Sequence, residues 1–223
     1  LTFVGCADVG DQPAVVAGQI RTVLKLEVGS RNEAATWEEF LRQFIAFTRE
    51  AGVLVMINGV VGNNTHRPLN PREVRGLAIT HAFAPLVCVN GADTKSGQIF
   101  TLAHELAHIW VGKGGVSNSA ADDLPEQLAP DSTVERFCNA VAAEVLVPMA
   151  QLSNMELPTD VDQAKAMIAR TFRTSTLVAL RRMKDLGRLS YDDFQDAYDA
   201  ELDFLKRKVK QKKSTGGDFY NTM

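Results

Sequence analysis

Residues 99–111 read IFTLAHELAHIWV, and this stretch decides the fold. His104 and His108 stand four positions apart, so in a helix they lie about 6 Å apart along the axis and on nearly the same face. Two imidazoles placed in this way can bind one metal ion. Most of the other residues are apolar, and glycines at positions 112, 114 and 115 indicate where the helix ends. The sequence therefore predicts a buried, amphipathic, metal-binding helix over residues 99–111.

Glu105 is predicted to be the general base of this site. It is rotated by about 100° from His104, so its carboxylate misses the ion but can take a proton from the attacking water. An HExxH sequence also arises by chance on amphipathic helices. Here two of only four histidines in the chain fall within it, which favours a metal site.

A catalytic zinc ion needs a third protein ligand and an open position. The acidic candidates downstream are Asp122, Asp123, Glu126, Asp131, Glu135 and Glu144. We favour Glu135, because it lies early in a helix that is nearly uncharged and is predicted to run from Ser132 or Thr133 to about Val147. The alternative is an acid that only stabilises the helix N-terminus. Asn139 follows one turn later and is predicted to hold a ligating imidazole by its free N–H.

The order of predicted elements indicates an α+β fold. Helices are expected at 13–26, 36–51, 132–147, 161–172, 175–186 and 191–209 besides the metal-binding helix, strands at 53–57, 76–80 and 86–90, a loop at 58–73 and a polar connection at 114–131. We expect a small antiparallel or mixed sheet packed on helices, followed by a helical C-terminal region. The predicted parts are an N-terminal segment (1–35), a metal-binding domain (36–158) and a helical region (159–223).

Composition narrows the class of protein only modestly. The 223 residues are 45% hydrophobic and 23% charged with a net charge of −3, which is ordinary for a globular protein and excludes neither nucleic acid nor membrane partners. No apolar run approaches the ~20 residues that span a bilayer, and no signal peptide is visible after Leu1. Cys6, Cys88 and Cys138 form no CxxC pair, which favours a reducing compartment. We therefore expect a cytoplasmic protein that has no membrane partner. Because the chain begins with Leu rather than Met, sequence upstream of it is also expected.

Several segments resemble the ImmA/IrrE family of bacterial metallopeptidases. Residues 100–108 resemble its FTLAHELxH signature, and residues 135–148, ERFCNAVAAEVLVP, resemble its ExxxNxxAAExLxP segment. Residues 75–79 and 85–90 resemble the strand pair before the active helix. The helix-turn-helix that many relatives carry upstream is not visible here, and residues 216–220 resemble a segment that usually continues further.

The resemblance implies a zincin-like metallopeptidase domain in which Zn²⁺ is held by His104, His108 and Glu135. Zinc suits a site of two histidines and one carboxylate, although manganese or iron can also occupy one. The family further implies proteolysis of a regulator, often a repressor, as the reaction. A protein substrate is therefore the expected partner.

Two further features of the expected reaction are open. A substrate strand is predicted to add to a sheet edge formed by Val87, Cys88, Val89 and Asn90, although these residues are equally explained as a core strand. His66 and His81 are candidates for stabilising the oxyanion, yet ordinary surface histidines are the more common case.

Two alternatives to catalysis also follow from the sequence. Residues 166–186 resemble a helix-turn-helix whose second helix carries Arg181, Arg182 and Lys184, so a non-catalytic regulatory module that binds DNA or a protein is possible. A packing hairpin that supports the metal domain is the favoured explanation, and the basic residues at 206–213 are expected to be a solvated end. A structural metal ion closed by Cys138 is the second alternative.

Overall fold

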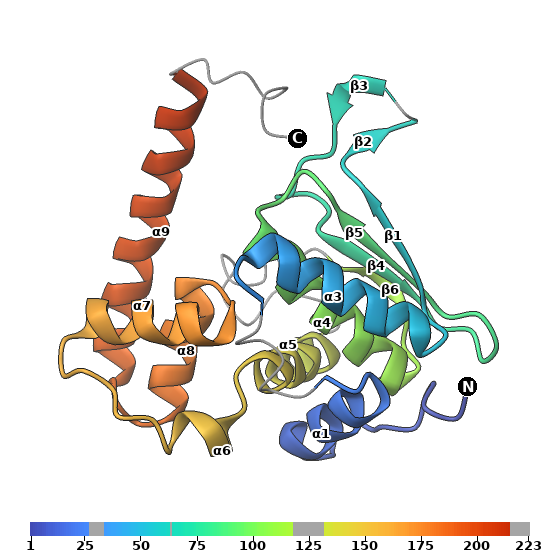
Figure 1. Ribbon diagram of the computed structural model, residues 1–223, viewed down its shortest axis with the longest axis horizontal. Helices are drawn as coiled ribbons and strands as arrows, with labels where there is room; N and C mark the ends of the chain where they lie inside the picture. Colours follow the sequence, from blue (N-terminus) through green and yellow to red (C-terminus); the bar gives the residue numbers. More distant parts are fainter. Residues whose placement is uncertain (27–33, 63, 118–131, 215–223) are drawn as a thin grey trace.

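The computed structural model describes residues 1–26, 34–62, 64–117 and 132–214 of the chain. A small mixed sheet packs on helices and a helical region follows it, so the fold is α+β as predicted (Figure 1). The helices are α1 (Pro13–Val23), α3 (Trp37–Glu50), α4 (Lys95–Val111), α5 (Ser132–Leu146), α6 (Met149–Leu152), α7 (Val161–Phe172), α8 (Thr176–Asp185) and α9 (Tyr191–Ser214). The strands are β1 (Leu54–Asn58), β2 (Val60–Val61), β3 (Asn64–Pro68), β4 (Gly76–Ile79), β5 (Leu86–Asn90) and β6 (Gly115–Ser117).

The main sheet has the strand order β1-β5-β4-β6. Strand β1 runs parallel to β5, whereas β4 runs antiparallel to both β5 and β6. Val87, Val89 and Ala78 are buried, while Leu54 and Ile79 are about half exposed. Since side chains alternate between the faces of a strand, one face of the sheet is covered and the other is open. Figure 1 shows α3 and α4 along the covered face.

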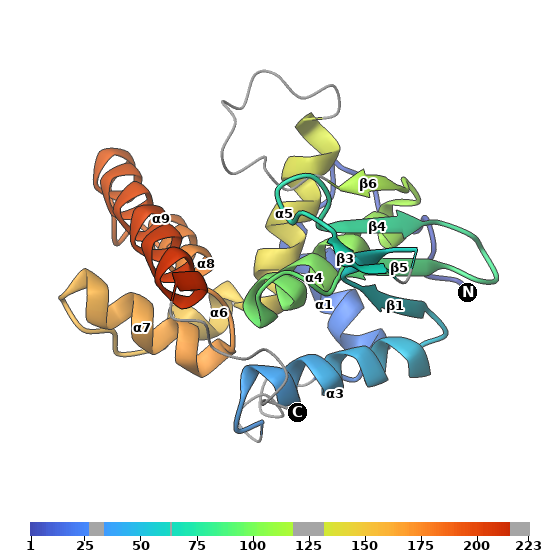
Figure 2. The same ribbon diagram turned by 90° about the horizontal axis from the view of Figure 1, so that it is seen from above.

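Helix α4 lies at the centre of the molecule, between the sheet and α5 (Figure 2). It begins at Lys95, four residues before the predicted start, because the Thr94 side chain caps it by accepting a hydrogen bond from Gly97 N at 3.1 Å. Gly97 lies in the first turn of α4, where an added Cβ would meet the Asp93 carboxylate. The helix ends as predicted at Gly112, which adopts the left-handed conformation with φ 73°.

Other predicted elements are present with small shifts in their ends. Thr36 caps α3 by accepting from Glu39 N at 3.1 Å, and the Glu39 carboxylate accepts in turn from Ala35 N, one residue before the cap. Helix α1 ends at Val23, three residues earlier than expected. Helices α5, α7 and α8 lie where they were predicted, and Ser175 caps α8.

Two predictions about loops are wrong. Residues 58–73 were expected to lack regular structure, but they contain the β2–β3 ribbon, whose β3 residues are all exposed. An exposed polar strand has no apolar alternation to reveal it. Strand β6 lies at the start of the expected polar connection and pairs with β4. The rest of that connection, residues 118–131, lies outside the described part of the chain.

Helices α7 and α8 share the main core with α4 and α5, whereas α8 and α9 form a second, small cluster of Leu180, Phe194 and Tyr198. The main cluster of buried apolar side chains includes Ile20 of α1, Leu106 of α4, Val141 of α5, and Ile168 and Met183 of α7 and α8. It therefore crosses both predicted boundaries, near residues 35 and 158, and the division into three parts stays a prediction. Among the described helices, none is both long and apolar enough to cross a membrane.

Candidate metal centre

Helices α4 and α5 bring His104, His108 and Glu135 together at their contact. Glu135 Oε2 lies 3.2 Å from His104 Nε2, and its Oε1 lies 3.2 Å from His108 Nε2. The two histidine Nε2 atoms are 3.0 Å apart. Within the part of the chain that the structure describes, these three residues form the group whose ligand atoms all lie within 4.8 Å of one another.

The size of this triangle fits a metal ion. Nitrogen and oxygen ligands at about 2.0–2.2 Å from a tetrahedral zinc ion lie roughly 3.3–3.6 Å apart. The three separations between the ligand atoms are only a few tenths of an ångström shorter than this. Both histidines are buried and Glu135 is about a quarter exposed, so one side of the group is open to solvent. The arrangement therefore offers three ligands and leaves room for a fourth position.

A backbone carbonyl orients His108. Its Nδ1 lies 2.8 Å from Lys113 O, and because a carbonyl oxygen can only accept, Nδ1 carries the proton and Nε2 faces the metal position. The carbonyl reaches the ring because Gly112 turns the chain back after α4. Sequence reasoning missed Lys113, and the glycines after the HExxH sequence were the signal that could have found it.

The predicted role of Asn139 is not what the structure shows. Lys113 holds His108 instead, and His104 Nδ1 is buried without a hydrogen-bond partner among the described residues. Asn139 lies one turn after Glu135 on α5, half-buried, but it makes no described hydrogen bond to either ring. Proximity on a helix face could be predicted, whereas the direction of the amide could not.

In the metal-free protein, the Glu135 carboxylate attracts the protonated form of the neighbouring imidazole. Burial lowers the pKa of His108, but the contacts with Cys138 and with the Glu135 carboxylate, which accepts from the ring, outweigh burial and raise that pKa to about 11. Burial raises the pKa of Glu135, but the two imidazoles lower it by more than burial raises it. The pKa of Glu135 therefore lies well below its usual range. Cys138 therefore contacts His108, yet it is not a member of the metal-capable group among the described residues. This speaks against a structural ion closed by that thiol.

Glu105 is fully buried beside the ligands, and it faces strand β4. Its carboxylate lies against Gly76, close enough that a Cβ at that position would be 2.9 Å from the Glu105 carboxyl carbon. A charged group with no exposure is costly unless the site around it is built for it. Its position on α4, between the two histidines, is the one that the sequence predicts for a general base.

The predicted substrate strand is wrong in its location. Val87, Cys88, Val89 and Asn90 belong to β5, which is hydrogen-bonded to β1 on one side and to β4 on the other. An interior strand has no free edge to accept a peptide. The alternative interpretation, a core strand, is correct, because Val87 and Val89 are buried.

Neither candidate for the oxyanion joins the metal centre. His66 is exposed on β3, and His81 is exposed in the turn between β4 and β5. His81 Nδ1 already accepts from the backbone N–H groups of Phe83 and Ala84. Both histidines are therefore explained by local structure.

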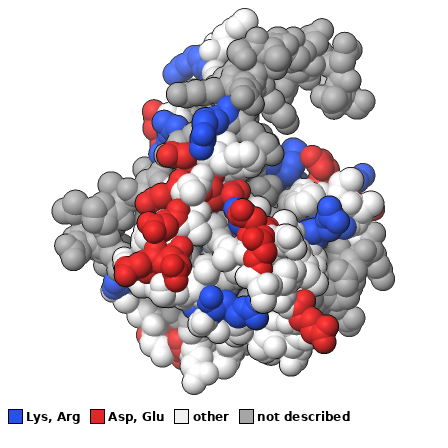
Figure 3. Space-filling view, turned by 90° about the vertical axis from the view of Figure 1, so that its left-hand side faces the viewer, with Lys and Arg blue, Asp and Glu red and all other residues white. Residues whose placement is uncertain are grey.

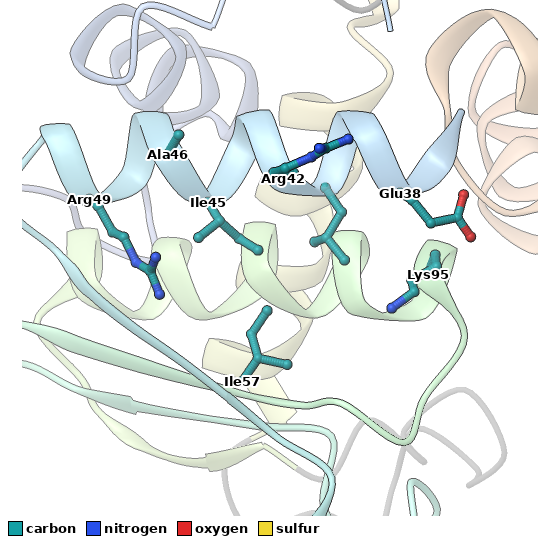
Figure 4. A pocket seen from close by; sticks show the side chains of 8 residues that line it. Glu38, Arg42, Ile45, Ala46, Arg49, Ile57 and Lys95 are labelled. Atoms are coloured by element: carbon teal, nitrogen blue, oxygen red, sulfur yellow. The ribbon is translucent and has the colours of Figure 1, made fainter. Parts of the chain in front are cut away.

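A groove of about 430 Å³ lies between α3 and β1, apart from the metal centre (Figure 4). It is lined by Glu38, Leu41, Arg42, Ile45, Ala46, Arg49, Ile57 and Lys95. None of the predicted ligands or catalytic residues is among them. Arg49 Nη2 also donates to Val55 O at 2.9 Å, so this side chain shields the outer edge of β1.

The helix-turn-helix candidate forms a hairpin, but its key arginine is not available to DNA. Arg182 is buried, pairs with Glu144 of α5 and donates from Nε to Val147 O at 3.0 Å. The Lys184 ammonium stacks over the rings of Tyr191 and Phe194. The helix-turn-helix hypothesis counted the charges of Arg182 and Lys184 but could not know that both side chains contact other parts of the protein. These contacts fit the alternative of a hairpin that packs on the metal domain.

Acidic side chains also lie on the surface near this hairpin. Figure 3 shows both acidic and basic side chains on the face that carries α7 and α9, with acidic ones grouped near its centre. Helix α9 contributes exposed Asp192, Asp193, Asp196 and Asp199 to the chain's surface. The carboxylates at these four positions disfavour close contact with phosphates. The side chains of most of residues 206–213 lie outside the described part, so the predicted solvated tail stays a prediction.

Together, the α+β fold and the group of two histidines and a glutamate define a metallopeptidase-like domain. A family model described as the IrrE N-terminal-like domain of peptidase family M78 matches residues 48–184, more than half of the chain. The chain belongs to this family, which confirms the resemblance to ImmA/IrrE. The match begins in α3 and ends in α8, so it includes both helices of the metal centre. A comparison with curated proteins found no match.

Proposed function

We propose that this chain is a zinc-dependent endopeptidase that hydrolyses a peptide bond in a protein substrate. The observation that carries the proposal is the meeting of His104, His108 and Glu135 at the α4–α5 contact, with Glu105 on the same buried helix. Structural zinc sites usually close all four positions with cysteine or histidine. Three ligands beside a buried glutamate fit a catalytic site better.

Each residue has a distinct role in the proposed reaction. His104, His108 and Glu135 would hold Zn²⁺, which supplies a Lewis acid that polarises the scissile carbonyl. Glu105 takes the proton of the attacking water and then passes it to the leaving amine. The Lys113 carbonyl keeps the proton of His108 on Nδ1, which leaves Nε2 for the metal.

The proposed substrate is a regulatory protein, of which a transcriptional repressor is the foremost candidate. This choice rests on the resemblance to the ImmA/IrrE family, which implies proteolysis of a regulator. The three cysteines are free, which favours the reducing environment of the cytoplasm as the place of action.

A peptide digest tests the proposal without knowledge of the substrate. The zinc-loaded protein is incubated with denatured casein, and new peptide termini are identified by mass spectrometry. We expect termini that appear with the wild type and disappear with Glu105→Gln or with a chelator. If wild type and Glu105→Gln give the same termini, or neither gives any, peptide hydrolysis is contradicted and a non-catalytic regulatory module becomes the better account.

A further inference from the structure

Gly76 stands where strand β4 meets the active helix. A Cβ built on Gly76 would overlap Glu105 Oε1 and lie 2.5 Å from Thr101 Cγ2. Real Cβ atoms do not approach other atoms so closely. The φ angle of Gly76 is not in the left-handed region, so the glycine is required by space and not by backbone conformation.

The backbone at Gly76 cannot move away to make room. Gly76 is paired with Val89 of β5 on one side and with Ser117 of β6 on the other. Next to it, Asn90 N donates to Arg75 O at 2.8 Å. Strand β4 is thus fixed from both sides, and any side chain at position 76 must displace what lies beneath it.

The groups beneath it differ in how they can respond. Thr101 is buried and branched at Cβ, so its methyl group has few alternative positions. The Glu105 carboxylate lies at the end of a side chain with three rotatable bonds, so it is the group that would move. Because Glu105 has no exposed surface, a displaced carboxylate has no direct path into solvent.

We propose that Gly76 is a positioning residue for Glu105, because the missing side chain leaves the space in which the Glu105 carboxylate is held. The inference rests on the proposed function for the role of Glu105, but the steric relation between the two residues does not. Proton transfer requires the base within hydrogen-bond reach of its proton. A displacement of about 1 Å can cost on the order of 100-fold in rate.

The test compares Gly76→Ala with Gly115→Ala in the full chain. Gly115 lies on the neighbouring strand, has a φ outside the left-handed region, and has open space at its Cβ position. We expect Gly76→Ala to keep about one zinc per chain while kcat on denatured casein falls about 100-fold and KM changes little. Gly115→Ala should leave zinc content and kcat unchanged. Equal kcat for Gly76→Ala and the wild type would overturn the proposal.

A second measurement does not depend on activity. Gly76→Ala should lower the urea midpoint of the metal-free protein, and the same change should have little effect in a chain that already carries Glu105→Ala and Thr101→Ser. Those two changes remove the groups that the new methyl meets. An equal loss in both backgrounds would overturn the proposal, even if the wild type has no peptidase activity. If Gly76→Ala alone does not fold, the triple variant should.

Discussion

Glu135 and His108 hold opposite charges in the metal-free protein, and a metal ion would have to replace the proton that they share. The raised pKa of His108 and the lowered pKa of Glu135 both express this contact. Metal binding needs the imidazole neutral and the carboxylate ionised. The same residues therefore stabilise the fold in two ways, with opposite dependence on pH.

The metal-free protein is expected to be most stable between about pH 5 and pH 6.5. His108 has a folded pKa of about 11 against an ordinary value of 6.5, so its contribution is complete below pH 6.5 and is lost as the pH rises toward 11. Glu135 has a lowered pKa, so its contribution is complete above its ordinary value of 4.5 and is lost as the pH falls below it. Thermal unfolding of chelator-treated protein between pH 4 and pH 9 measures this.

Two controls separate this effect from general pH sensitivity. In Glu135→Gln, the loss of stability between pH 6.5 and pH 9 should be smaller. Added zinc should raise the melting temperature more at pH 8 than at pH 6, because protons compete with the metal. A metal-free wild type whose stability rises from pH 6.5 to pH 9 would be inconsistent with the imidazolium–carboxylate contact.

At the scale of elements, the turn at the C-terminal end of α4 places the Lys113 carbonyl beside the metal ligand His108. Gly112 has φ 73°, and an added Cβ would lie 2.9 Å from Gly5 Cα. Gly112→Ala should therefore cost at least about 1 kcal/mol, which is the usual penalty for alanine in this conformation. It should also move Lys113 O away from His108 and weaken zinc binding by about 10-fold or more, since outer partners of ligands commonly matter that much.

Gly187→Ala is the matched control for this prediction. Gly187 has a similar φ of 75°, nothing lies within 4 Å of its Cβ position, and it is not among the residues that touch the metal centre. It should show a comparable backbone cost but unchanged zinc affinity in a competition titration. Equal zinc affinity for both variants and the wild type would remove the role assigned to the Lys113 carbonyl.

A buried ion pair between α5 and α8 also holds two elements together. Arg182 and Glu144 are both buried, and Glu144 Oε1 also accepts from Met149 N. Removing one partner of a buried pair typically costs about 3–5 kcal/mol, because the other charge is left uncompensated. Arg182→Ala should lower the free energy of unfolding by about this amount, measured by urea denaturation. The exposed Arg181→Ala should change it by less than about 1 kcal/mol; similar losses for both variants would argue against the pair.

The sequence predicted the helices of the site because their signals are local. The HExxH spacing, the apolar face of α4 and the glycine at its end are all contained in about 18 residues. The strand order is not local, so β5 was taken for an edge although β1 and β4 enclose it. Strand β6 and the Gly76–Glu105 contact also depend on pairing between segments far apart in the chain.

At the scale of the whole molecule, one core joins the metal-binding helices to the C-terminal hairpin. Buried residues of α7 and α8, including Phe172 and Met183, belong to the same cluster as Leu102 and Leu106 of α4. Arg173 also donates from Nη2 to Ala34 O at 2.8 Å, which ties the α7–α8 turn to the segment before α3. The hairpin therefore supports the metal domain, and charge counting alone could not distinguish this role from DNA binding.

This packing predicts that the protein does not bind duplex DNA. Arg182 of the hairpin is buried, and the neighbouring helix α9 exposes Asp192, Asp193, Asp196 and Asp199. Fluorescence anisotropy with a labelled duplex should show no binding at micromolar protein and 150 mM salt. Binding that weakens steeply between 50 and 200 mM salt, as it does when several phosphates are contacted, would instead support the regulatory-module alternative.

The measurement that tests the central claim most directly is the metal content of protein purified without added metal. Mass spectrometry should find about one zinc ion per chain in the wild type. Glu135→Ala should lose the ion, because one of three ligands is removed, whereas Glu105→Gln should keep it, because Glu105 is not a ligand. A wild type that holds no metal and takes up none from stoichiometric zinc, or a Glu135→Ala variant that binds it as well as the wild type, would contradict the account.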